Sequence, residues 1–163
     1  MKLDLIQPFI NSADAVFAEA LNCTTRIEGL SMEEQRYQRK GMAALVTISG
    51  EIEGRVIVDM EQETALRAAS QLAGQEVSAS DDLARETVCE LANLVIGNAV
   101  TNLNDRGFRF KVHPPEFHAS AEGLKGSEET EAVVLSFETE TGRVYVNIAI
   151  RYKGRRKNDT AHW

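Results

Sequence analysis

Three polar side chains and one glycine in this sequence are spaced so that they could form a single chemical surface. Glu86, Glu90, Asn93 and Gly97 follow one another at steps of four, three and four residues, so in a helix they form one continuous stripe. A carboxylate can bind a cation, and a carboxamide accepts and donates hydrogen bonds without titrating. Glycine in mid-helix costs roughly 0.5–1 kcal/mol relative to alanine, but it leaves a bare position that another surface can approach closely. Leu94 adds an apolar flank, and together these features indicate a docking surface.

A merely solvated helix face is the competing interpretation of the same pattern. Exposed glutamate and asparagine are common on helices, so periodicity alone leaves the two interpretations equally open. The opposite side of this helix is apolar at helical spacing, and we expect it to face a sheet. Its members are Ala84, Val88, Leu91, Ala92, Val95 and Ala99. The helix is expected to begin near Ser80, which can cap it, and to run to about Asp105, before Gly107.

The remaining elements must hold this helix in place. Before the long helix, the patterns predict a helix over 8–21 with Pro8 in its first turn, then a loop or irregular edge strand over 23–41. Strands are predicted at 42–49 and 55–60 around a turn at 50–54, followed by a helix over 61–73 that Gly74 ends. After the long helix, we expect a strand at 108–112, a loop at 122–131, and a hairpin of 132–140 and 143–153. This order predicts an α+β fold with long helices packed on one face of a mainly antiparallel sheet. We expect one domain over 1–153, followed by a basic, flexible tail over 154–163.

Composition excludes several classes of function. The chain has 163 residues, 43% of them hydrophobic, and a formal net charge of -7. That charge opposes broad attraction to nucleic acid or to an anionic membrane. The N-terminus does not resemble a signal peptide and no stretch reaches the roughly 18 apolar residues of a membrane span, so we expect a cytoplasmic protein. Any partner must be recognised locally.

Metal and redox chemistry are not indicated either. Cys23 and Cys89 lie far apart in apolar patterns, where cysteine usually behaves as a small hydrophobic residue. His113 and His118 flank a Pro-Pro-Glu-Phe segment, but no further ligands complete a zinc site, and a turn with surface histidines is the simpler interpretation. We therefore predict no metal and no cofactor in this chain.

The segment from Glu90 to Ala99, E-L-A-N-L-V-I-G-N-A, resembles the signature helix of the CheC/CheX/FliY phosphatases of bacterial chemotaxis. That signature has a glutamate three residues before an asparagine, a glycine shortly after, and a proline about two dozen residues on, which Pro115 matches. Length, the Pro-Phe-Ile start of the first helix and the order of elements resemble CheX over nearly the whole chain. One departure is Glu86, where the family often has Asp or Ser, although a carboxylate is retained.

This resemblance implies a CheC-like fold and a hydrolase that removes the phosphoryl group from the phospho-aspartate of a CheY-type response regulator. It implies that Asn93 orients the attacking water and that Glu90 pairs with a lysine of the regulator, which also supplies Mg²⁺. We expect Glu86, Leu94 and Gly97 to contact the regulator, and the chain to form a homodimer. The matching part of the first helix has Asn11 without the glutamate, so we expect one active site.

Two other functions fit the same sequence. The stripe could bind phosphorylated receiver domains, or a flagellar-switch or scaffold partner, without hydrolysis. A hotdog-type thioesterase also places a long helix against an antiparallel sheet, although no residue here points to an acyl-CoA.

Overall fold

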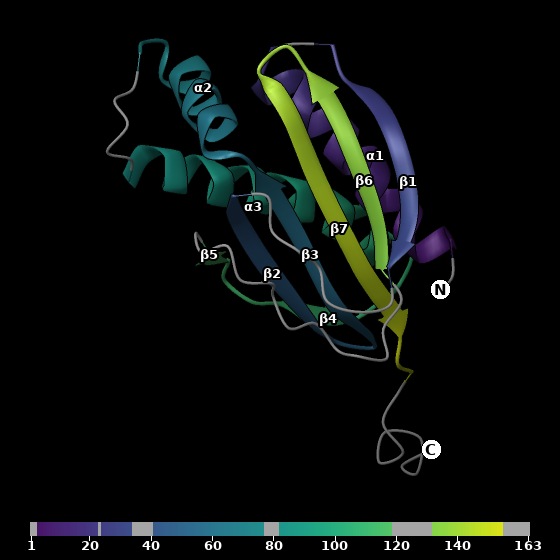
Figure 1. Ribbon diagram of the computed structural model, residues 1–163. Helices are drawn as coiled ribbons and strands as arrows, with labels where there is room; N and C mark the ends of the chain where they lie inside the picture. The colour runs from purple at the N-terminus through teal and green to yellow at the C-terminus, as the bar shows by residue number, and fades with distance from the viewer. Residues whose placement is uncertain (1–2, 23, 34–40, 77–81, 119–131, 155–163) are drawn as a thin grey trace, which may run out of the picture.

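A seven-stranded antiparallel sheet is the frame on which the helices pack (Figure 1). The computed structural model describes residues 3–22, 24–33, 41–76, 82–118 and 132–154. The elements are α1 (Leu3–Ala20), β1 (Arg26–Glu33), β2 (Met42–Gly50), β3 (Ile52–Met60), α2 (Gln62–Ala73), α3 (Asp82–Asp105), β4 (Phe110–Val112), β5 (Glu116–His118), β6 (Ala132–Thr139) and β7 (Gly142–Tyr152). The strand order is β1-β6-β7-β3-β2, and both β4 and β5 pair with β2.

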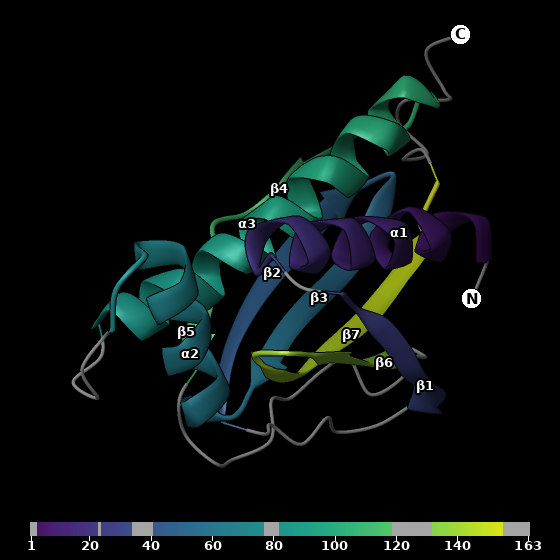
Figure 2. The same cartoon turned by 90° about the horizontal axis from the view of Figure 1, so that it is seen from above.

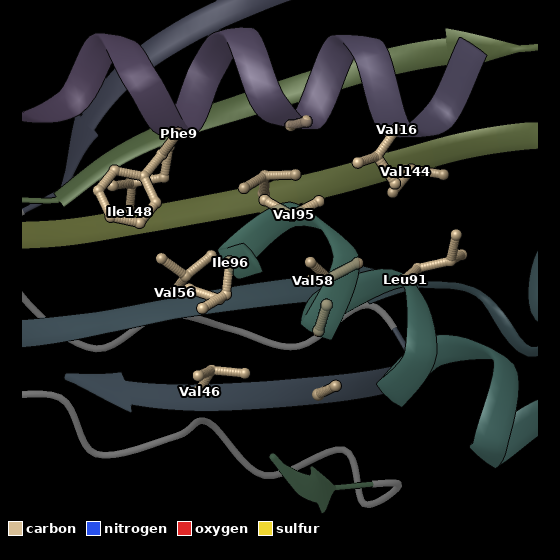
Figure 3. Packing of buried hydrophobic residues seen from close by; sticks show 14 of the residues in the cluster. Phe9, Val16, Val46, Val56, Val58, Leu91, Val95, Ile96, Val144 and Ile148 are labelled. Carbon is tan, nitrogen blue, oxygen red and sulfur yellow. The ribbon is translucent and has the colours of Figure 1, made fainter. Parts of the chain in front are cut away.

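The three helices are segregated from the strands, and α1 and α3 lie together across one face of the sheet (Figure 2). Along each strand, the residues that face the helices pack against the apolar residues of α1 and α3, and these contacts form the core between the sheet and the helices. Figure 3 shows Phe9 and Val16 of α1, and Leu91, Val95 and Ile96 of α3, beside valines and Ile148 of the central strands. The predicted α+β fold with helices on one face of an antiparallel sheet is thus confirmed.

The turn between β6 and β7 lies close against α2. Thr139 pairs with Gly142 across a tight turn, as the sequence predicted for this segment. Gly142 has a φ of 140°, and a Cβ there would lie 2.5 Å from the hydroxyl of Thr64 on α2. Only glycine therefore allows the turn and α2 to approach this closely.

Two element boundaries differ from expectation, at the start of the first helix and at the start of β3. The first helix begins at Leu3, so Pro8 lies inside α1 and not in its first turn. The helix extends because Leu5 and Ile6, each 2% exposed, already pack in the core. Strand β3 begins at Ile52, which is fully buried, so the turn after β2 is shorter than predicted.

Other predicted elements agree with the structure. The segment after α1 contains an edge strand, β1, whose pairing with β6 is interrupted by a register shift between Ile27 and Gly29. Gly74 ends α2 in a left-handed conformation with φ of 72°. The proposed cap Ser80 and the expected loop at 122–131 lie outside the described residues. Within the described ranges, no helix is both long and apolar enough to cross a membrane.

Candidate functional site

Helix α3 has one buried side and one exposed side, as its spacing predicted. Its buried residues are Ala84, Thr87, Val88, Leu91, Ala92, Val95, Ile96, Ala99 and Leu103, which include all six positions expected to face the sheet. This burial fixes the rotation of the helix about its own axis. The residues on the other side must therefore project away from the core.

The predicted stripe lies on that outward side. Glu86, Glu90, Asn93 and Gly97 are all exposed. In the part of the chain that the structure describes, none of the three side chains makes a hydrogen bond or an ion pair. Two carboxylates and one carboxamide are thus available to another molecule, spread over about 10 Å of helix at 1.5 Å per residue.

Gly97 leaves open space at the C-terminal end of this stripe. A Cβ built on Gly97 would meet no heavy atom within 4 Å, so the packing of the chain itself does not require glycine here. The Gly97 carbonyl accepts a hydrogen bond from the Thr101 hydroxyl, one turn later, at 3.0 Å. The bare position is accessible from solvent, as a surface for close approach requires.

Leu94 is 41% exposed beside the stripe. A second exposed leucine of α3, Leu83, was not among the residues predicted for the site. Leu83 and Leu94 are eleven residues apart, about three helical turns, so they lie on nearly the same line along the helix. That spacing in the sequence could have shown that Leu83 lies on the same side of the helix as Leu94.

Helix α1 supports α3 from behind the stripe. The hydroxyl of Ser12, a residue only 6% exposed, donates a hydrogen bond to the carbonyl oxygen of Val95 at 2.6 Å. On the outer side of α1, Asn11 accepts a hydrogen bond from the Gln7 side chain at 2.8 Å. The Asn11 side chain therefore has a partner within its own helix, whereas the Asn93 side chain has no hydrogen-bond partner among the residues that the structure describes.

The two histidines lie along the edge of the sheet and not in a surface turn. His113 is half-buried, its ring Nε2 lies 2.8 Å from the Ser49 hydroxyl, and its backbone N–H donates to the Thr47 carbonyl. His118 ends strand β5, which the sequence did not predict. Backbone pairing with β2 draws both residues into the sheet, because β4 and β5 bond to opposite ends of that strand.

Pro115 precedes β5, and β5 is held against α3. The Arg85 guanidinium of α3 lies over the Phe117 ring, 5.3 Å from its centroid. This cation–π contact places the segment carrying the signature proline beside the N-terminal half of the helix that carries the stripe.

Neither a metal centre nor a reactive thiol emerges from the described residues. Among the residues at 3–22, 24–33, 41–76, 82–118 and 132–154, no three His, Cys, Asp or Glu side chains are grouped to hold an ion. Partial burial raises the pKa of the Cys89 thiol, although the charge of Arg85 opposes this. Cys89 is therefore protonated near neutral pH and packs against the core. Cys23 lies outside the described residues.

Comparison with solved structures defines the class of fold. The structure resembles a CheC-like superfamily protein from Shewanella sp. PV-4 with a TM-score of 0.82 and 20% identity, covering 93% of this chain and 99% of that one. It also resembles a chain in the CheX–CheY–BeF3–Mg²⁺ complex from Borrelia burgdorferi, with a TM-score of 0.70 and 34% identity, covering 92% and 99% of the two chains. The fold is thus CheC-like.

Sequence comparison identifies the family within that class. Residues 42–138, which contain the whole stripe and Pro115, match the family model for the chemotaxis phosphatase CheX. The CheY-P phosphatase CheX of Thermotoga maritima is 32% identical over 75 residues, 45% of this chain and 48% of that protein, so the match spans about half of that relative's length. The chain belongs to the CheX family of chemotaxis phosphatases.

Proposed function

We propose that this chain accelerates hydrolysis of the phospho-aspartate of a CheY-type response regulator, which docks on the exposed stripe of α3. The observation that carries the proposal is the placement of Asn93. It is exposed at the centre of α3, one turn after Glu90, and neither side chain has a partner within the described chain. Membership of the CheX family and the complex of its Borrelia relative with CheY support this choice of substrate.

Hydrolysis of the phospho-aspartate does not require the catalyst to form a covalent bond. A water oxygen attacks phosphorus, the bond from phosphorus to the aspartyl oxygen breaks, the aspartate leaves as a carboxylate, and both protons of the water leave on inorganic phosphate. The step needs a water in line with the leaving oxygen and stabilised charge on the phosphoryl oxygens. The Asn93 carboxamide can hold that water, since it both accepts and donates hydrogen bonds and stays neutral. The proposal requires no cofactor in this chain, because the regulator supplies the Mg²⁺.

The other residues of the stripe bring Asn93 to the reacting centre. Glu90 pairs with a lysine of the regulator and fixes the docked orientation. Gly97 lets the regulator approach the helix backbone, while Leu94 covers apolar surface at the edge of the contact. Glu86 adds negative charge one turn before Glu90. We also propose that the chain works as a homodimer; β1 lies at one edge of the sheet.

A phosphoryl-decay assay tests the role of Asn93. The cognate regulator is phosphorylated, and loss of its phosphoryl group is followed with and without this protein. We expect Asn93→Ala to lose about a hundredfold in acceleration, as happens when a preorganised catalytic group is removed, and to fold normally because residue 93 is exposed. Asn98→Ala is the matched control, since Asn98 is an exposed asparagine of the same helix about 140° around the axis.

Binding to the beryllofluoride-activated regulator separates docking from catalysis. Asn93→Ala should still bind it, whereas Glu90→Gln should bind more weakly and lose part of the salt dependence of binding, because one charge pair is removed. An Asn93→Ala protein that hydrolyses at the parental rate contradicts the proposed role. A parental protein that binds the activated regulator without speeding decay would instead be a binding module.

A further inference from the structure

Ser12 makes a polar contact that joins α1 to α3 in the interior. A serine in a helix can bond the carbonyl four residues before it, which here belongs to Pro8. Ser12 instead donates to Val95 on the other helix, at 2.6 Å. The residue is 6% exposed, and a buried hydroxyl without a partner is strongly unfavourable. The position of Val95 is thus coupled to that of α1.

The bonded carbonyl lies at the centre of the functional helix. Val95 is two residues after Asn93 and two before Gly97. Glycine gives the weakest helix propensity of any residue except proline, and nothing in the described chain packs where its side chain would be. The stripe therefore includes the position at which α3 has the least intrinsic stiffness.

The packing around this contact favours a rigid junction. Ala13 follows Ser12 on α1, and Ala92 and Ala99 stand three residues before and four residues after Val95 on α3. All three are at most 1% exposed, and small side chains at such spacing let two helices approach closely. The Val95 side chain is fully buried against the sheet (Figure 3). The Ser12 bond adds a directional restraint to this apolar contact, because a hydrogen bond weakens steeply when its angle changes.

We infer that Ser12 is a positioning residue: its hydrogen bond to Val95 holds the α3 backbone beside Gly97 and so fixes where Asn93 presents its carboxamide to the docked regulator. This inference rests on the proposed function of Asn93. Ser12 contacts neither the regulator nor the water. It acts through the backbone of α3, where a displacement of about 1 Å at the reacting atoms can cost a hundredfold in rate.

The first test measures amide hydrogen exchange in the full chain without any regulator. Ser12→Ala removes only the hydroxyl and should speed exchange several-fold at 96–101, with little change elsewhere. Thr87→Val is the matched control. It removes a buried hydroxyl that lies on α3 itself and donates to the Leu83 carbonyl within the same helix. Exchange at 96–101 that is unchanged in Ser12→Ala, or raised equally throughout the protein, overturns the inference.

The second test measures dephosphorylation of the regulator over a range of concentrations. We expect Ser12→Ala to lower kcat roughly three- to tenfold with KM unchanged, because docking residues are intact, and Thr87→Val to change neither. Measured at saturating regulator, the loss in kcat caused by Ser12→Ala should shrink when Gly97→Ala stiffens the helix in the same protein, although Gly97→Ala itself raises KM because residue 97 belongs to the docking surface. A change in KM alone overturns the inference. A parental protein that never accelerates decay contradicts the proposed function, and the exchange pattern then still decides whether Ser12 restrains Val95.

Discussion

The guanidinium of Arg106 donates a hydrogen bond to the carbonyl oxygen of Asp4 at 2.8 Å, four residues before Pro8. In a regular helix that carbonyl would accept from the N–H of residue 8, which proline lacks. Arg106 therefore supplies the missing donor, and its other nitrogen lies 3.6 Å from the Asp4 carboxylate. A residue just after α3 thus stabilises the first turns of α1.

Replacing Arg106 should destabilise the protein, because Pro8 cannot donate a hydrogen bond to the Asp4 carbonyl. We expect Arg106→Ala to lower the free energy of unfolding by about 1–2 kcal/mol, because a helix carbonyl loses its donor. The loss should be smaller in a Pro8→Ala background, since residue 8 then supplies its own N–H. Urea denaturation of the four proteins measures the difference. Arg67→Ala, which removes an exposed pair with Glu63 on α2, serves as control and should cost under about 1 kcal/mol. Equal losses of unfolding free energy with Pro8 and in the Pro8→Ala background would contradict the conclusion that Arg106 replaces the N–H that Pro8 lacks.

Two exposed leucines offer a paired test of the docking surface. Leu94 on α3 is 41% exposed and Leu72 on α2 is 44% exposed. We expect both alanine substitutions to change stability by no more than about 0.5 kcal/mol, as is usual for surface positions. Leu94→Ala should raise KM for the phosphorylated regulator several-fold, whereas Leu72→Ala should leave it unchanged. Steady-state dephosphorylation measures KM for both variants. Equal KM values would show that Leu94 is not part of the docking surface.

Substitution of Gly97 should move stability and activity in opposite directions. Gly97→Ala should stabilise the protein by about 0.5–1 kcal/mol, because its Cβ meets no atom of the chain. Gly97→Leu should also fold, since the position is open. Both should weaken docking, leucine more than alanine, because each fills the space that the regulator would approach. Thermal denaturation together with KM measures both effects, and full activity in Gly97→Leu would refute the close approach.

Glu53 makes stability depend on pH in a defined range. Partial burial raises its pKa, but the hydrogen bonds and positive charges of Arg151 and Lys153 outweigh burial and hold the pKa below its usual value. A carboxylate with a lowered pKa stabilises the folded state above its unfolded pKa, near 4.3, and this contribution is lost as pH falls through the folded pKa. Denaturation midpoints of the parent and Glu53→Gln should therefore differ at pH 7 and converge in acid. A difference between the two midpoints that persists at low pH would show that a group other than Glu53 causes the pH dependence of stability.

The sequence predicted best those features that depend on local spacing. The buried and exposed sides of α3 follow from a repeat within one helix, so Asn93 and Gly97 could be placed outward without any tertiary information. The end of α2 at Gly74 is equally local. In these segments, propensity and burial favour the same structure.

Features that depend on distant partners were not predictable. Pro8 was expected at a helix start because nothing nearby reveals that Arg106 supplies its donor. Strand β5 has only three residues and no alternation of its own, and exists because β2 offers an edge. Ser12 lies on an apolar helix face, where its type and spacing give no indication of the Val95 carbonyl on α3.

Core packing and the proposed recognition surface use different residues of a single helix. Val88, Leu91 and Val95 are buried and determine how α3 sits on the sheet, whereas the exposed side chains of Glu86, Glu90 and Asn93 make no hydrogen bond or ion pair with the described residues. Outward residues can therefore change without disturbing the interior. Under the proposed function, preference for one receiver over another then diverges between related proteins through a few surface substitutions, while the proposed catalytic amide, Asn93, and its scaffold are retained.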